Sequence, residues 1–179
     1  MAQLLQGWIK FWLFFSSVVC FYDGFFLVMR PRTFPGGDLA WQFPYKFWHI
    51  YSEYDLRYPD ENDSITWVMG VFNLLEVALN VLSLLLVFCG SFHGVRLAFT
   101  STCFVLWKSA IFLALFLGPD ATEHVAETDA ATKFWVLWAP AGIWVVIPLL
   151  VLLGLWSKLN PATGLIAGST NSAKKKKRY

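Results

Sequence analysis

Three ionisable side chains lie far inside long apolar stretches of this sequence: Asp23, Glu76 and Lys108. On insertion scales such a group costs about 2.5–3.5 kcal/mol at the centre of a bilayer, so we expect each to have a partner or a function. Two acids and one base leave one carboxyl without a counter-charge. A carboxylic acid that stays protonated in an apolar pocket is a proton donor, which indicates acid–base chemistry. Two other interpretations stay open: an internal ion pair that only locks the fold, and a path for protons or ions.

The three groups are predicted to lie at similar depths in the membrane. With a rise of about 1.5 Å per residue, Asp23 lies about 9 Å from the nearer end of its apolar stretch, and Glu76 and Lys108 about 14 Å. Trp144, in the last apolar stretch, lies about 15 Å deep on the same scale. Four helices can therefore each offer one group to a single layer.

Two amide side chains accompany Glu76 at helical spacing. Asn73 and Asn80 lie about one turn before and after it, and therefore on the same helix face. We expect them, together with Lys108, to set the protonation state of the acids. The histidines fall in predicted loops and the three cysteines in apolar stretches, and their spacing fits no metal site. The sequence therefore predicts neither a metal nor a cofactor.

The elements that hold these residues are four apolar segments long enough to cross a bilayer, which takes about 20 residues. They are Trp8–Met29, Trp67–Cys89, Val95–Leu117 and Phe134–Trp156. Of the 179 residues 57% are hydrophobic and 15% charged, whereas a soluble domain has about 25% charged residues. This composition excludes a soluble enzyme, a disordered chain and a nucleic-acid-binding protein. The predicted fold is an all-α polytopic membrane protein, a bundle of four transmembrane helices over residues 8–156 with a basic tail over residues 157–179.

Basic residues are distributed unevenly between the two predicted sides of the membrane. The side of the termini has eight Lys and Arg residues, and the opposite side has five against ten acids. Because Lys and Arg favour the cytosolic side, both termini are predicted to be cytosolic and the long first loop lumenal. The final lysines, with Lys176 and Lys177 among them, fit a dilysine retrieval signal of the endoplasmic reticulum. The alternative is a polybasic tail that touches anionic lipid of the bilayer.

The loop between the first two spans, residues 30–66, is predicted to fold back over the bundle as a lid. A structureless loop of this length is unusual in a compact domain, and rings such as Trp48 and Tyr51 need an apolar neighbour. Asp55 is expected to pair with Arg57 or Arg30. The alternative is that the rings lie only at the membrane surface.

Four strings carry a resemblance to a known family. The first span contains Tyr22-Asp23-Gly24-Phe25, and the loop from Trp48 to Tyr58 reads W-x-x-Y-x-x-x-D-x-R-Y. The second span has Glu76 with Asn80 four residues later, and the fourth has Trp138-Ala139-Pro140 and then Trp144 four residues before Pro148. On these strings the chain resembles the emopamil-binding protein and sigma-2 receptor superfamily, the EXPERA domain, which includes sterol isomerases of the endoplasmic reticulum.

The resemblance implies that Asp23 and Glu76 are two pocket acids that bind a cation, with the ring of Trp144 facing it. The chain departs from the isomerase pattern at four positions. Where the isomerases have a His, an Asn, their second acid and a Gln, this chain has Val19, Ala141, Met69 and Lys108. The superfamily also includes members that cyclise terpenoid chains, and a sequence with these departures fits that group as well.

Isomerisation and cyclisation share a first step, in which a buried acid protonates a C=C bond or an epoxide and a carbocation forms. The predicted function is therefore a membrane-embedded isomerase or cyclase of a sterol, terpenoid or meroterpenoid, with Glu76 as acid, Asp23 as base or cation stabiliser and Trp144 as cation–π wall. The further residues expected to contact the substrate are Tyr22, Trp48, Tyr51, Asn73, Asn80 and Lys108. A binding protein for sterols or cationic amines and a structural membrane adaptor are the competing classes. A homodimer is also expected from the resemblance.

Overall fold

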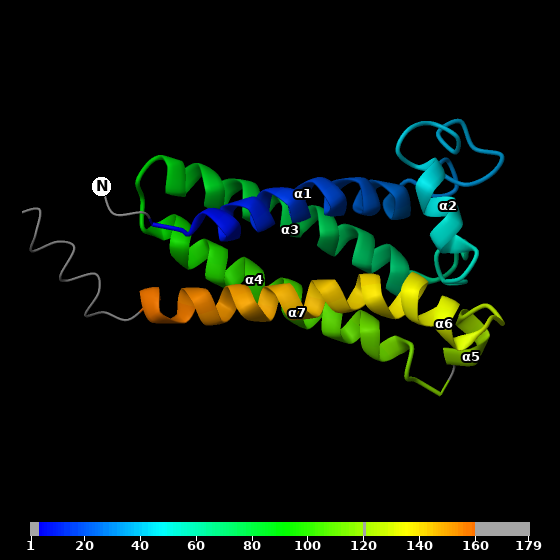
Figure 1. The fold of residues 1–179 in the computed structure, drawn as a ribbon. Coiled ribbons are helices and arrows are strands. Elements are labelled where there is room, and N and C mark those ends of the chain that lie inside the picture. The colour runs from blue at the N-terminus through cyan, green and yellow to red at the C-terminus, as the bar shows by residue number, and fades with distance from the viewer. Residues whose placement is uncertain (1–3, 120, 160–179) are drawn as a thin grey trace, which may run out of the picture.

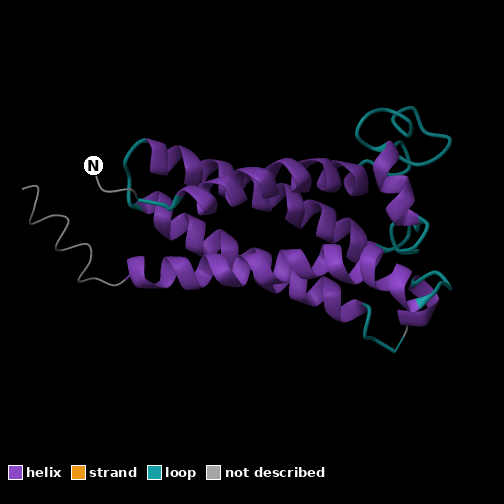
Figure 2. Ribbon diagram, in the orientation of Figure 1, coloured by secondary structure: helices purple, strands orange, loops and turns teal. Residues whose placement is uncertain are grey.

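The computed structural model describes residues 4–119 and 121–159 and has four helices that are long and apolar enough to cross a membrane (Figures 1 and 2). They are α1 (Gly7–Val28), α3 (Ser64–Phe88), α4 (His93–Leu115) and a composite last span. The last span joins α6 (Ala130–Lys133), a π-helical segment (Phe134–Trp138) and α7 (Ala139–Trp156). The predicted all-α, four-span membrane fold is confirmed, and the described residues form no strand. The basic tail and its lysines lie outside the described residues.

Local signals in the sequence set the helix boundaries. The carboxylate of Asp63 accepts a hydrogen bond from the amide of Ile65 and so caps the start of α3. At its other end, Gly90 has a φ of +75°. The amide of Ser91 then reaches the carbonyl of Leu86, and that of Gly90 the carbonyl of Val87. These are the two bonds of a Schellman cap, which turns the chain sharply from α3 into α4.

Helices α1 and α3 approach each other closely near the two loops. A Cβ atom on Gly24 would lie 2.8 Å from the carbonyl oxygen of Gly70, and one on Gly70 would lie 2.7 Å from the Cβ of Leu27. Small residues permit such close approach between spans. The contact matters for function because it brings Asp23, beside Gly24, next to Asn73, one turn after Gly70.

The two ends of the bundle differ. At one end, where both described termini lie (Figure 1), α1 packs on α7 through a buried cluster that includes Ile9, Leu13, Val151 and Leu155. We call the opposite end the loop end. There the chain between α1 and α3 forms the short helix α2 (Lys46–Ser52), and the chain between α4 and α6 forms α5 (Ala121–His124).

The first loop folds back over the loop end, as the lid prediction required. The ring nitrogen of Trp48 reaches a carboxylate inside the bundle, that of Asp23. The two loops are also joined, because the amide of Leu56 donates to the carbonyl of His124 and the amide of Ala126 to that of Tyr54. We call residues 45–58, which include α2, the lid.

Arg30 holds the lid in place in a way that the sequence did not suggest. Its guanidinium donates to the carbonyl oxygens of Leu27, Arg57, Tyr58, Asp60 and Asp63 at 2.6–3.4 Å. Of the two partners expected for Asp55, Arg30 therefore bonds to carbonyl oxygens, and the contact with Asp55 comes from Arg57. Asp55 accepts hydrogen bonds from the hydroxyl of Tyr51 and from the amide of Arg57.

The last span changes its helical form just before the site. Five residues, Phe134–Trp138, are π-helical, and Pro140 follows in the first turn of α7. Proline has no amide hydrogen and disturbs the helix around it, and single π turns occur often at functional sites. From Ala139 to Trp156 the span is α-helical, with Pro148 inside it, and it presents Ala141 and Trp144 to the interior of the bundle.

Candidate functional site

A cavity of about 360 Å³ lies inside the bundle beneath the lid. All four spans and α2 contribute to its wall. Its lining residues are Val19, Cys20, Asp23, Phe47, Trp48, Tyr51, Tyr58, Met69, Asn73, Lys108, Ser109, Phe112, Pro140, Ala141 and Trp144. Most of this wall is aromatic or aliphatic, with a few polar groups at one side, which is the usual composition of a site for an apolar ligand.

Asp23 is the carboxylate in that wall, and three donors converge on it. The indole nitrogen of Trp48 lies 2.6 Å from Oδ1, and the hydroxyl of Tyr58 lies 3.1 Å from the same atom. The side-chain amide of Asn73 donates to Oδ2. Asp23 accepts all three bonds. An ionised carboxylate can accept them, and so can a neutral carboxyl, because a protonated carboxyl keeps acceptor capacity beside its one O–H donor. Two of the three donors come from the lid region, so the site is complete only when the lid is closed.

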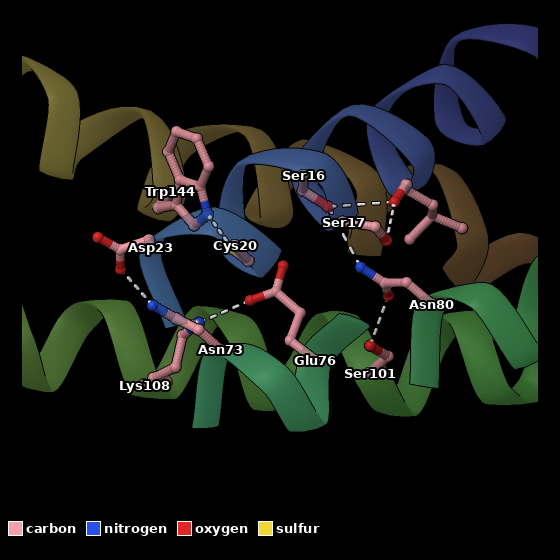
Figure 3. Close-up of polar contacts among 11 residues, drawn as sticks. Ser16, Ser17, Cys20, Asp23, Asn73, Glu76, Asn80, Ser101, Lys108 and Trp144 are labelled. Carbon is pink, nitrogen blue, oxygen red and sulfur yellow. Dashed lines mark hydrogen bonds and ion pairs between the residues drawn. The ribbon is translucent and has the colours of Figure 1, made fainter. Parts of the chain in front are cut away.

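Lys108 connects this carboxylate to the second buried acid (Figure 3). Its ammonium nitrogen donates to the side-chain oxygen of Asn73 and lies 2.6 Å from Oε2 of Glu76. The Glu76 side chain is 0% exposed and that of Lys108 only 5%. The order of contacts is thus Glu76, Lys108, Asn73 and Asp23, and it runs from α3 to α4, back to α3 and then to α1.

The two acids do not share the cavity wall. Asp23 lines the cavity, whereas Glu76 does not and lies fully buried in ion-pair contact with Lys108. The expectation that both acids face one pocket is therefore wrong for Glu76. The other oxygen of Glu76, Oε1, is buried without a hydrogen-bond partner. The ion pair with Lys108 is therefore the main interaction that offsets the cost of removing this carboxylate from water.

Trp144 forms the wall next to Asp23 and contacts α1. Its ring nitrogen lies 3.4 Å from the sulfur of Cys20. Its ring packs edge to face on that of Trp12, with 5.4 Å between the ring centroids. The indole is thus held in one orientation with part of its surface on the cavity. Its predicted position beside Asp23 and Lys108 agrees with the structure, while its role as a cation–π partner stays a prediction.

Two other predicted contact residues lie elsewhere. Asn80 bonds to the hydroxyls of Ser16 and Ser101 in a separate buried polar layer, one turn or more beyond Glu76 (Figure 3). Tyr22 neighbours Asp23 in sequence, but its ring packs on Phe21. Neither lines the cavity, so the structure does not place them among the residues that a ligand there would touch.

The sequence interpretation missed several wall residues that spacing could have found. Phe112 lies one helical turn after Lys108, and Cys20 lies three residues before Asp23, so each shares a helix face with a residue that was singled out. Tyr58 is the last residue of the W-x-x-Y-x-x-x-D-x-R-Y motif, which places it in the lid. No pattern in the sequence shows that its hydroxyl reaches Asp23.

The lid has its own buried acid. Asp55 is 0% exposed, and burial raises the pKa of this carboxyl to about 6, although the hydrogen bonds from Tyr51 and Arg57 act to lower it. Burial also raises the pKa of Tyr51 and Tyr58 well above the ordinary value of 10. Both tyrosines therefore keep their hydroxyl hydrogens at neutral pH and remain donors to Asp55 and Asp23.

No family model, curated protein or solved structure matches this chain. Within the described residues, no group of three or more His, Cys, Asp and Glu side chains is arranged to hold a metal ion. The interpretation of the site therefore depends on its own geometry.

Proposed function

We propose that the protein is a membrane-embedded isomerase or cyclase of an isoprenoid, either a sterol or a terpenoid, and that it acts through a carbocation. The observation that carries the proposal is the surroundings of Asp23. One carboxyl faces an apolar, aromatic cavity, and three donors from three parts of the chain point at it. The sequence resemblance to the EXPERA domain supports the same class.

In this proposal the acid is Asp23, and not Glu76 as predicted from the sequence. The neutral Asp23 carboxyl gives its proton to one carbon of a C=C bond, and the π electrons form the new C–H bond. The carboxylate left behind is stabilised by Trp48, Tyr58 and Asn73, which are already oriented toward the charge that develops. An epoxide substrate would take the proton on oxygen, and its C–O bond would break.

The cation that remains lies among aromatic rings and beside the carboxylate. Each ring face, such as that of Trp144, contributes about 0.5–2 kcal/mol to a cation nearby. Asp23 then removes a proton from a neighbouring carbon, whose C–H electrons form the new double bond. One proton enters and one leaves, so a single carboxyl can serve as acid and as base, and the reaction needs no further reagent.

Glu76 and Lys108 have a positioning role in this scheme. Lys108 bonds to the oxygen of Asn73 and thereby directs the Asn73 amide nitrogen toward Asp23. Glu76 neutralises the charge of Lys108 within the bundle. The buried pair thus fixes a donor of the site without contact to the substrate.

A second candidate function is the binding of a sterol or of an amphipathic amine without chemistry. The burial of Glu76 behind Lys108 favours it, because only one carboxylate then remains for a ligand cation. For both functions we propose the endoplasmic reticulum membrane as the location, with both termini cytosolic. The basic residues on the side of the termini support this orientation. A homodimer remains part of the proposal on the sequence resemblance alone.

The test is an assay of the chain in microsomes with a panel of sterols and linear isoprenoids, analysed by mass spectrometry. We expect a product from the wild-type chain and none from Asp23→Asn. The matched control is Asp38→Asn, which removes an exposed carboxylate that pairs with Arg32 on the surface. Full turnover by Asp23→Asn would rule out this acid. No turnover of any substrate, together with amine binding that depends on Asp23, would assign the protein to the binding class.

A further inference from the structure

Helix α2 of the lid is apolar on two faces. The inner face directs Trp48 and Tyr51 to the cavity and its polar groups. The outer surface has four large side chains that remain well exposed: Trp41 (71%), Phe43 (76%), Ile50 (59%) and Phe47 (52%), of which Phe47 also borders the cavity. We call these four residues the outer lid face.

The outer lid face is a local cluster and not a set of scattered residues. Phe47 and Ile50 lie three residues apart in α2 and therefore on one side of the helix, and Phe43 lies in the turn before it. The rings of Phe43 and Phe47 are in contact at 6.0 Å between centroids. A helix with large apolar side chains on two faces requires an apolar neighbour on both, and within the described residues the protein supplies one only for the inner face.

The position of α2 in the bundle indicates which neighbour covers the outer face. It lies beside the ends of α1 and α3 at the loop end (Figure 1), where a four-span protein leaves the membrane. The first turn of α3, at the same end, exposes Ile65 and Trp67. Exposed apolar and indole side chains at span ends are typical of the interfacial layer of a bilayer. The outer lid face and this exposed turn of α3 thus lie at the same end of the bundle, where the spans reach the membrane surface.

We propose that the outer lid face lies in the interfacial layer of the bilayer and that lipid holds the lid closed over the cavity. The partner is the boundary between headgroups and acyl chains of a zwitterionic phospholipid. Lys46 fits this arrangement, because its ammonium lies 5.2 Å from the ring of Phe47 and its long side chain can reach the phosphate level from the same place. The proposal depends on the membrane-spanning fold and not on the reaction proposed for the cavity.

The experiment places an environment-sensitive fluorophore on the outer lid face. The full-length chain, with Cys89→Ser and Cys103→Ser to remove the less buried thiols, is labelled at Ile50→Cys and, separately, at Phe43→Cys. The control is Glu61→Cys, an exposed residue of the same loop outside α2. Each labelled chain is placed in phosphatidylcholine nanodiscs with and without a lipid that has a nitroxide near its headgroup.

We expect a blue-shifted emission and a loss of fluorescence with the nitroxide lipid at both outer-face positions, and neither at Glu61. Water-like emission without quenching at both outer-face positions would overturn the proposal. Equal quenching at Glu61 would also overturn it, because the whole loop, and not this face, would then be in lipid. A blue shift that appears only in native microsomes would overturn it in favour of a protein partner. The two labelled positions guard against one variant that fails to fold.

Discussion

Asp23 has three hydrogen-bond donors and a place in the cavity wall, and its charge should therefore discriminate between ligands. Asp23→Asn keeps the shape of the side chain and removes the counter-charge. We expect it to weaken binding of a hydrophobic cationic amine by about tenfold or more, as the loss of a bond to a charged group implies, and to change binding of a neutral sterol far less. Competition binding in detergent with one ligand of each kind measures the difference. Equal losses for both ligands would mean that Asp23 acts by shape alone.

The Lys108–Glu76 pair makes a different prediction, about stability. Lys108→Met would leave the Glu76 carboxylate buried without its counter-charge, and we expect a loss of about 3–5 kcal/mol in the free energy of unfolding. Lys108→Met combined with Glu76→Gln should recover much of this loss, since no buried charge then remains. Denaturant unfolding in micelles for the wild type, both single variants and the double variant gives the coupling energy. Additive effects of the two substitutions would contradict a direct pair.

The sequence predicts how deep a residue lies in the membrane. It does not predict as well in which direction around the helix the side chain points. Counting from the span ends placed Asp23, Lys108 and Trp144 in one layer, and the structure brings all three to one cavity. Glu76 has the right depth too. It is absent from the wall because the long Lys108 side chain reaches its carboxylate first, and such a pairing depends on how α3 and α4 are rotated against each other.

At the scale of elements, Arg30 should control the lid. Its donors reach carbonyl oxygens on both sides of the loop, which no shorter or neutral side chain would satisfy at once. We expect Arg30→Gln to reduce hydrogen-exchange protection of residues 45–58. The control is Arg32→Gln, because Arg32 makes an exposed pair with Asp38, and such surface pairs contribute little. Equal exchange in the two variants would remove the special role of Arg30.

The buried acid of the lid predicts a dependence on pH. Burial raises the pKa of Asp55 from its ordinary 3.8 to about 6 in the closed lid. The closed lid therefore binds a proton that the open lid would release, and this contribution to closure is complete below about pH 4 and lost as the pH rises through 6. We expect slower proteolysis of the lid at pH 5 than at pH 7.5, after correction for the protease's own pH dependence. Asp55→Asn should abolish the difference, and a difference that persists would point to another group.

Long elements were more predictable than short ones. The four spans follow from apolar runs, and their observed ends differ from the predicted ones by only a few residues, except where the fourth begins as α6. Helix α2, the bridge between the two loops and the π-helical segment have no such signal. Each contacts a part of the chain far away in sequence. Trp48 of α2 bonds to Asp23, the amide of Leu56 to the carbonyl of His124, and the ring of Trp138 in the π-helical segment packs on Phe116.

For the whole molecule, the even number of spans fixes both described termini at one end of the bundle, opposite the lid. A glycan acceptor site inserted between residues 118 and 133 should be modified if that end faces the lumen, as we propose. An acceptor inserted in the turn between α3 and α4 should stay unmodified, because that turn lies at the other end (Figure 1). Gel mobility with and without a glycosidase measures this, and the reverse result would invert the orientation of the whole protein.

The π-helical segment at Phe134–Trp138 has a consequence for changes in chain length. A π turn contains one residue more than an α turn that covers the same contacts. Removal of one residue from this segment should therefore leave a continuous α-helix, with Pro140 and Trp144 held in place by the packing of α7 on α4 and α1. The part of the chain before the deletion, α6 and the second loop, would then rotate relative to α7. We therefore expect that the fourth span can shorten by one residue without any change at the cavity.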